Sequence, residues 1–184
     1  MMQNISEEES LLLQCLATTS LLGELSNANF FESNYFKCLS FSNEGCKKIL
    51  MQSGIGNPAT MQMMLYALLT VPKEILERSA YCELENYIIR INPLVCSLVE
   101  EETHSNYDGE ESKETINYFR HIRNAVAHSR CMYLSENHKN YVIFSDNNQS
   151  NTKICSIKME CYKVDYILME LQKLIMEYYN NIHS

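Results

Sequence analysis

The side chains most suited to chemistry lie in one short run of arginines and histidines. Three arginines and two histidines fall between positions 120 and 130, although the whole chain of 184 residues carries a net charge of −8. Arginine offers a permanent, forked cation that suits a phosphate, and histidine exchanges a proton near neutral pH. The inner part of the run is Arg123, Asn124 and His128. These residue types could cleave RNA without a metal ion.

The spacing determines how these side chains could meet if the run is helical. Each residue turns a helix by about 100°, so Asn124 and His128 are adjacent on its surface and could hydrogen-bond. Arg123 and His128 lie about 140° apart, so a straight helix does not direct both at one phosphate. Three solutions stay open. The arginine bends round, the helix ends before His128, or a second copy of the chain completes the site.

The run resembles the signature of the HEPN superfamily (higher eukaryotes and prokaryotes nucleotide-binding domains). That signature is an arginine, a polar residue, three variable residues and a histidine, which Arg123, Asn124 and His128 match. The resemblance implies a helical bundle and a nuclease that dimerises with two motif helices facing each other. The small Ala125 and Ala127 would let such helices approach closely. The remaining helices match the superfamily only in general layout.

The residue types and the resemblance together predict a metal-independent endoribonuclease that needs no cofactor. His128 would remove the 2′-OH proton or protonate the leaving 5′-oxygen, and Arg123 would hold the scissile phosphate. Asn124 would orient the imidazole. Because the nucleophile belongs to the RNA, the product would carry a 2′,3′-cyclic phosphate.

Three further side chains of the run are expected to contact RNA, namely Arg120, His121 and Arg130. A metal site that joins His121 to His128 is disfavoured, because seven residues separate them by about 10.5 Å along a helix. The remaining histidines carry no spatial argument and are expected at the surface. They are His104, His138 and His183.

Two other classes of function stay open. One is a catalytically silent HEPN module that binds RNA, a nucleotide or a protein partner, and the other is a purely structural helical adaptor. Some HEPN toxins carry a tyrosine two residues after the histidine, which an antitoxin modifies. Arg130 occupies that position and the nearest tyrosine is Tyr133, which puts that mode of control in doubt. A toxin, stress or phage-defence role, with an antitoxin or defence partner, remains open.

The composition is that of an ordinary globular protein, with 46% apolar and 21% charged residues. We expect one domain over residues 1–184. The negative charge disfavours broad, nonspecific binding to nucleic acid and favours a small, selected RNA. The N-terminus lacks the basic start of a signal peptide, and no apolar run approaches the ~20 residues that span a membrane. We therefore expect a cytoplasmic protein with reduced cysteines, of which Cys15, Cys82, Cys96 and Cys161 should be buried.

The pattern along the chain predicts an all-α, up-and-down helical bundle with a small β-hairpin inserted before the last helix. Helices are expected at about 7–25, 57–70, 72–91 and 162–179, with one or two more within 30–51. The motif helix should run from a cap at Ser112 to about Ser129. Strands are expected at 141–144 and 154–159. The polar stretch 100–111 is the strongest loop prediction.

Overall fold

Helices make up most of this computed structural model, which describes residues 6–105, 107, 109–148, 150 and 152–183. The α-helices are α1 (Glu7–Asn27), α2 (Asn34–Cys38), α3 (Glu44–Ser53), α4 (Pro58–Leu65), α5 (Val71–Ile75), α6 (Arg78–Ile88), α7 (Asn92–Leu98), α8 (Tyr118–Ala127) and α9 (Cys161–Ile182). The strands are β1 (Glu101–Ser105), β2 (Cys131–Glu136), β3 (Lys139–Asn147) and β4 (Ile154–Glu160). The predicted mainly helical architecture is confirmed. None of the described helices is long and apolar enough to cross a membrane.

The β-structure is larger than the predicted hairpin. The hairpin itself is confirmed, since β3 and β4 pair antiparallel from Tyr141 opposite Glu160 to Asn147 opposite Ile154. Two further antiparallel strands extend it into one sheet with the order β1-β4-β3-β2. The loop predicted at 100–111 was therefore wrong over β1. This strand has the sequence Glu-Glu-Thr-His-Ser and lies at the edge of the sheet, where no apolar alternation is required.

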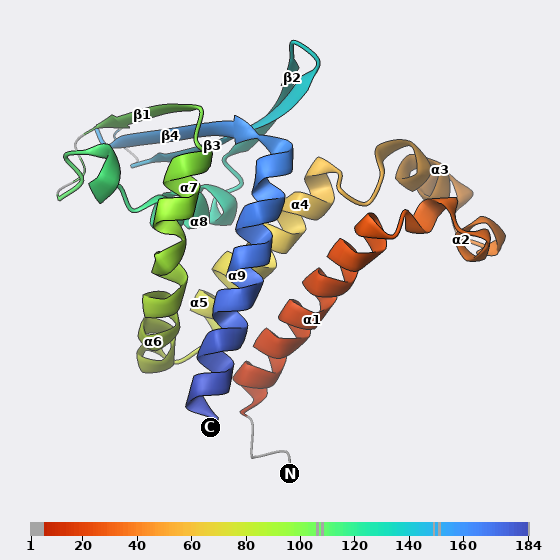
Figure 1. Cartoon of the computed structure of the whole chain (residues 1–184), viewed down its shortest axis with the longest axis horizontal. Coiled ribbons are helices and arrows are strands. Elements are labelled where there is room, and N and C mark those ends of the chain that lie inside the picture. Colours follow the sequence, from red (N-terminus) through yellow and green to blue (C-terminus); the bar gives the residue numbers. More distant parts are fainter. Residues whose placement is uncertain (1–5, 106, 108, 149, 151, 184) are drawn as a thin grey trace.

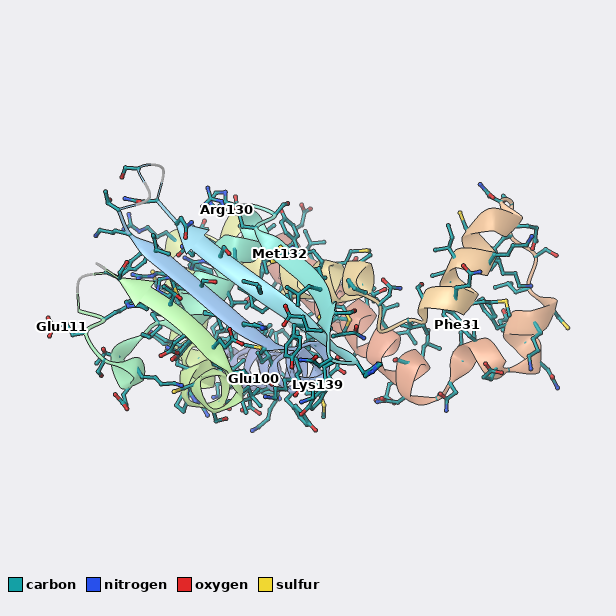
Figure 2. The ribbon with its side chains drawn as sticks, turned by 90° about the horizontal axis from the view of Figure 1, so that it is seen from above. Phe31, Glu100, Glu111, Arg130, Met132 and Lys139 are labelled. Carbon is teal, nitrogen blue, oxygen red and sulfur yellow. The ribbon has the colours of Figure 1, made fainter. Side chains whose placement is uncertain are left out.

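The sheet lies across one end of the long helices (Figure 1). Alternate residues of β3 and β4 point towards those helices and are completely buried: Val142, Phe144, Ile157 and Met159. In the view from above, the other face of the sheet is turned to the viewer and the helices lie behind it (Figure 2). The sheet and the helices therefore share one apolar core, and the motif helix α8 packs beneath β3.

The helix that begins at Pro58 continues past its predicted end. Asn57 caps it by accepting a hydrogen bond from the backbone of Thr60. A π-helical turn at Tyr66–Thr70 then joins α4 to α5, with Val71 N–H donating to the carbonyl of Tyr66. Pro72 has no N–H to donate, so it fits near the start of α5. The break predicted before Pro72 is thus a change of helix type.

The motif helix starts later than predicted. Ser112 caps a short 3-10 turn at Lys113–Thr115, and α8 itself is capped by the side chain of Asn117, which accepts from the backbone N–H of Arg120. Serine and asparagine are both favoured N-cap residues, so the sequence alone does not decide whether Ser112 or Asn117 begins the helix.

The end of α8 has the hydrogen bonds of a Schellman motif. Arg130 N–H donates to the carbonyl of Ala125 (2.8 Å), and Ser129 N–H donates to that of Val126 (3.1 Å). Ser129 has a left-handed backbone with φ = 54°, a position that usually holds glycine. The helix therefore stops at Ala127, and His128 forms its C-cap.

Candidate functional site

One face of α8 is packed into the core, as its amphipathic pattern predicts. Phe119, Ile122 and Val126 are each at most 2% exposed. Ala125 is completely buried within its own chain, so its predicted place in a contact between two motif helices is wrong. Ala127 is exposed. The part of α8 that another molecule can reach is therefore narrow and lies towards its C-terminal end.

His128 stands exposed where α8 ends. Its backbone N–H donates to the carbonyl of Asn124 (3.0 Å). Its imidazole makes no hydrogen bond or ion pair with any residue in the described part of the chain. Of the three arrangements that the spacing left open, a helix that ends before His128 is the one observed. The predicted side-chain hydrogen bond from Asn124 does not form.

Arg123 is turned into the molecule and meets a carboxylate. Its Nη1 donates to the hydroxyl of Tyr81 (2.7 Å) and to Oε1 of Glu85 (3.1 Å), both on α6. Only 10% of its side chain is exposed, and its guanidinium lies 5.4 Å from the ring centre of Phe119. Burial raises the pKa of Tyr81, although the charge of Arg123 opposes that rise. The arginine of the motif thus already has an anionic partner.

Asn124 links Arg123 to a second group of charges. Its Oδ1 accepts from Nη2 of Arg123 (3.3 Å), and its Nδ2 donates to Oδ2 of Asp146 on β3 (3.0 Å). With both ends of its amide occupied, Asn124 holds the motif arginine and the sheet in a fixed relation. It does not orient His128 in this structure.

His121 is the centre of a buried charge cluster, which we define as His104, Glu110, Arg120, His121 and Asp146. Nδ1 of His121 lies 2.8 Å from Oδ2 of Asp146, and Nε2 lies 2.7 Å from Oε2 of Glu110. Nε2 of His104 lies 2.7 Å from that same oxygen of Glu110. Arg120 donates to the other oxygen of Glu110. Both ring nitrogens of His121 thus face carboxylates in a core position.

The two carboxylates of this cluster are stabilised as anions. Burial raises the pKa of Glu110, but hydrogen bonding and charge from His121 and Arg120 outweigh it, so the pKa lies below its ordinary value. Asp146 follows the same pattern, with burial opposed by hydrogen bonds from His121 and Asn124. Buried carboxylates require hydrogen-bonding or charged partners, and His121, Asn124 and Arg120 supply them.

These positions change several predictions about individual residues. His121 is 1% exposed, so the predicted RNA contact is replaced by contacts with two carboxylates. His104 is not a surface residue but a half-buried partner of Glu110. Arg120 is partly exposed and paired with Glu110. Arg130 is exposed, and its guanidinium donates to the carbonyl of Asn147 (2.6 Å).

The partners of the motif were not found from the sequence. Glu85, Glu110 and Asp146 lie outside the arginine run, and their positions in the sequence do not link them to it. One signal was present: Asp146 continues the inward alternation of Val142 and Phe144 on β3. An acid at an inward strand position needs a buried partner.

The burial of the cysteines differs from prediction, although their oxidation state does not. All eight are free thiols. Of the four cysteines predicted to be buried, Cys82 is exposed, and Cys15, Cys96 and Cys161 are half-buried. The buried thiol is instead that of Cys155 on β4, which is 1% exposed. Burial raises the pKa of the Cys155 thiol to about 12.

A hollow of about 320 Å³ lies beside the end of α8. Its lining residues come from α4 and from the segment that follows His128: Pro58, Ala59, Gln62, Ser129, Cys131 and Tyr133. The hydroxyl of Tyr133 donates to Oε1 of Gln62 (3.1 Å). Because Ser129 follows His128 directly, a group bound in this hollow would lie near the exposed imidazole.

A helical fold that carries an Arg-Asn-x-x-x-His motif at the end of a late helix defines a HEPN-type domain. More specifically, residues 3–182 match the model of the family described as HEPN pEK499 p136, and the chain belongs to that family. The predicted resemblance is therefore confirmed, and it indicates a nuclease or a nucleotide-binding module. No curated protein and no solved structure matches the chain.

Proposed function

We propose that this HEPN protein is a metal-independent endoribonuclease that leaves 2′,3′-cyclic phosphate ends. The observation that carries the proposal is the exposed imidazole of His128, which is free of side-chain partners among the described residues and ends the motif helix. A general acid or base must be accessible to its substrate and uncommitted to other groups. His128 meets both conditions, whereas the buried His121 meets neither.

The proposed reaction gives His128 and Arg123 one role each. His128 removes the proton from the 2′-OH, or protonates the 5′-oxygen as the P–O bond breaks, and Arg123 stabilises charge on the phosphate. Asn124 acts through Arg123, whose fork it helps to fix. We propose that a second copy of the chain supplies the other acid or base, with the two α8 helices meeting near their exposed C-terminal ends.

A phosphate must compete with Glu85 for Arg123. The side chain of Glu85 is 35% exposed, so solvent reaches this ion pair from the carboxylate side. A phosphate that enters from that side can replace one anionic partner by another without leaving the guanidinium unpaired in a buried position. We infer that the ion pair lowers activity until substrate or a trigger displaces Glu85.

Substrate contacts are assigned to the surface around His128. The hollow next to Ser129 is suited to the nucleotide beside the scissile phosphate, with Tyr133 and Gln62 in its wall. Arg130 lies at the chain's entry into β2 and is exposed (Figure 2). We propose that it binds a flanking phosphate. Arg120 remains a weaker candidate for that role, because Glu110 already engages it.

The broader setting is also a proposal. We propose a single domain over residues 1–184 that acts in the cytoplasm in a toxin, stress or phage-defence role. An antitoxin or defence partner would then cover the end of α8 or hold Glu85 on Arg123. The small accessible surface and net negative charge suit a selected RNA better than a long tracked strand.

A catalytically silent HEPN module is the second candidate. The observation that favours it is the neutralisation of Arg123 by Glu85, together with its low exposure. Such a module would bind RNA, a nucleotide or a protein through the same surface without breaking a bond. It differs from the enzyme only in whether Arg123 becomes available to a phosphate.

The test compares purified wild-type protein with His128→Ala on total RNA in EDTA, followed by analysis of the product ends. The matched control is His138→Asn, since His138 is also exposed, has φ = 63°, and asparagine tolerates that backbone. We expect cleavage with cyclic phosphate ends from wild type and the control, and a loss of roughly 10²–10⁴-fold in His128→Ala. RNA binding without cleavage by all three proteins would favour the silent module.

A further inference from the structure

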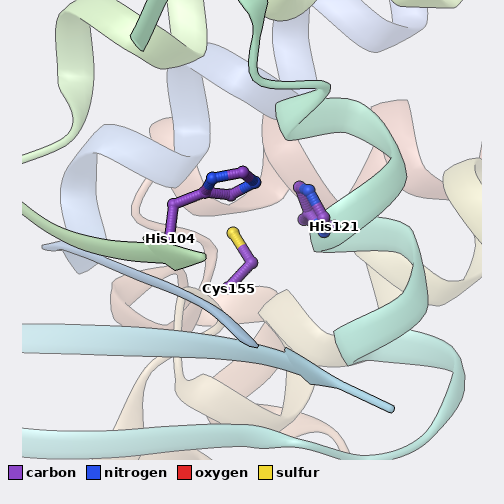
Figure 3. Close-up of side chains that lie close together, drawn as sticks. All are labelled: His104, His121 and Cys155. Atoms are coloured by element: carbon purple, nitrogen blue, oxygen red, sulfur yellow. The ribbon is translucent and has the colours of Figure 1, made fainter. Parts of the chain in front are cut away.

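One group of side chains has the composition of a metal site. His104 on β1, His121 on α8 and Cys155 on β4 bring one ligand atom each within 4.8 Å of one another. Figure 3 shows the two imidazoles and the thiol converging on a shared space between the sheet and α8. Glu110 adds a carboxylate oxygen that lies 2.7 Å from Nε2 of both histidines.

We propose that these four residues bind a structural zinc ion, through Nε2 of His104, Nε2 of His121, a carboxylate oxygen of Glu110 and the thiolate of Cys155. Two imidazoles, a carboxylate and a thiolate are all ligands that zinc accepts, and four protein ligands complete its tetrahedron. The proposal is independent of the ribonuclease function, because His128 takes no part in it.

The strand register explains why three of these groups meet. His104 is directly opposite Cys155 in the β1–β4 ladder, and Cys155 is directly opposite Asp146 in the β3–β4 ladder. Directly opposed residues project to the same face of a sheet. This row lies on the face that covers α8, from which His121 reaches up to it. The site is thus built on regular elements, with Glu110 contributed by the segment after β1.

The ligand atoms of His104, His121 and Cys155 lie within 4.8 Å of one another, which is close to the spacing of a zinc site. With Zn–N and Zn–O bonds of about 2.0–2.1 Å, neighbouring ligand atoms of a tetrahedron lie roughly 3.3 Å apart. Nε2 of each histidine lies 2.7 Å from the same oxygen of Glu110, so this oxygen would move outward by roughly 1–2 Å to let the ion enter between them. The sulfur of Cys155 would approach by on the order of 1 Å, since Zn–S bonds are about 2.3 Å long. Side-chain rotation covers movements of this size.

The groups behind the ligands are those that support a metal-bound histidine. Nδ1 of His121 donates to Asp146, which leaves Nε2 to face the proposed ion. Asp146 is fixed in turn by Asn124, and Arg120 holds the other oxygen of Glu110. Carboxylates that hold the far nitrogen of a ligating histidine set its tautomer and orientation.

Zinc binding requires ligand atoms that carry no proton. Each imidazole would bind as the neutral ring through an unprotonated Nε2, with its remaining proton on Nδ1, and the thiol of Cys155 would release its proton to solvent. The thiolate and the Glu110 carboxylate then balance the charge of the ion. Asp146 and Arg120 remain a compensating anion and cation.

Burial indicates a structural role for this ion. His121 and Cys155 are each 1% exposed and Glu110 is 8% exposed, which leaves little room for a water or substrate at the ion. Zinc sites with four protein ligands hold elements together and keep no open position for chemistry. Here the ion would tie β1, β4 and the segment that carries Glu110 to the motif helix.

The experiment measures metal directly. Protein purified without chelator is analysed for zinc by mass spectrometry, then stripped and titrated with Co²⁺, whose thiolate complexes have a charge-transfer absorption band. We expect one equivalent of zinc per chain and a cobalt band in the wild type. Cys155→Ser should lose the band, whereas Cys131→Ser, a half-buried thiol on β2, should keep it. His128→Ala should also keep it, which separates this test from that of the ribonuclease.

Two more variants distinguish the loss of zinc binding from a folding defect. His104→Gln keeps a donor for Glu110 at a half-buried position but removes a ligand, so it should fold and lose the zinc. Asp146→Asn should weaken zinc binding by roughly 10–100-fold while leaving the stoichiometry unchanged. The proposal is overturned if wild type binds no zinc or cobalt. It is equally overturned if the bound metal is unaffected by both Cys155→Ser and His104→Gln.

Discussion

The two ends of α8 place the same residue types in opposite surroundings. At its N-terminal end, Arg120 and His121 are engaged by Glu110 and Asp146, and His121 is almost inaccessible. At its C-terminal end, His128 and the following Arg130 are exposed. One helix therefore uses a histidine first to hold the fold together and then to present an uncommitted imidazole. The type of residue permits either role, and the neighbouring anions decide between them.

The largest effect should come from removing the buried histidine. His121→Ala leaves Glu110 and Asp146 as buried carboxylates with one partner fewer, and we expect the free energy of unfolding to fall by about 3–5 kcal/mol. His128→Ala, at the exposed end, should change it by less than about 0.5 kcal/mol. Urea unfolding in the presence of chelator measures both. Equal losses for the two variants would remove the distinction between the ends of α8.

The role of Arg123, which lies between the two ends of α8, is tested by its substitution. Arg123→Gln should reduce cleavage by roughly 10²–10³-fold, because it removes the cation that stabilises charge on the phosphate. Arg130→Gln should lower kcat/KM only a few-fold, as expected of a flanking phosphate contact. Initial rates on a short RNA provide the comparison, with thermal unfolding as the check on folding. A similar loss in both variants would contradict the assignment of Arg123.

A smaller effect of opposite sign is expected at the partner of Arg123. Glu85→Gln keeps an acceptor but removes the charge, so a phosphate should compete better and kcat/KM should rise roughly threefold to tenfold, equivalent to about 1 kcal/mol. Glu83→Gln is the matched control, since Glu83 is an exposed acid on the same helix. A fall in activity with Glu85→Gln would show that Glu85 assists cleavage.

The smallest effect concerns the turn that positions His128. Ser129 has φ = 54°, where glycine is free of the steric cost that a side chain pays. Ser129→Gly should therefore raise the free energy of unfolding by about 0.5–1 kcal/mol, with cleavage retained. Thermal unfolding and a rate measurement check both parts. Destabilisation would mean that the serine side chain stabilises the turn.

The sequence predicted those parts of the molecule that depend on local pattern. The apolar face of α8, the β3–β4 hairpin and the first helix after its Ser6 cap all follow from periodicity and capping. The edge strand β1 did not, because its polar sequence pairs on one side only. The site was predicted in its residue types but not in its partners.

The partners were missed because they depend on tertiary structure. Glu110 and His104 reach His121 only because β1 pairs with β4, and no local pattern encodes that pairing. Glu85 reaches Arg123 because the fold brings the side chains of α6 within hydrogen-bonding distance of this arginine. A formal net charge does not reveal such convergence, although these acids contact the arginines and His121 directly in the folded chain.

The strand order also determines when β1 can join the sheet during synthesis of the chain. β1 lies at an edge of the sheet, where it pairs with β4, which comes last in sequence among the described strands. Ribosomes add roughly 5–20 residues per second, so β1 and α8 wait for seconds before β4 exists. Until then, His104 and His121 have neither Cys155 nor a completed sheet above them. A nascent chain therefore carries the whole Arg-Asn-x-x-x-His motif before it can build the surroundings that hold it in place.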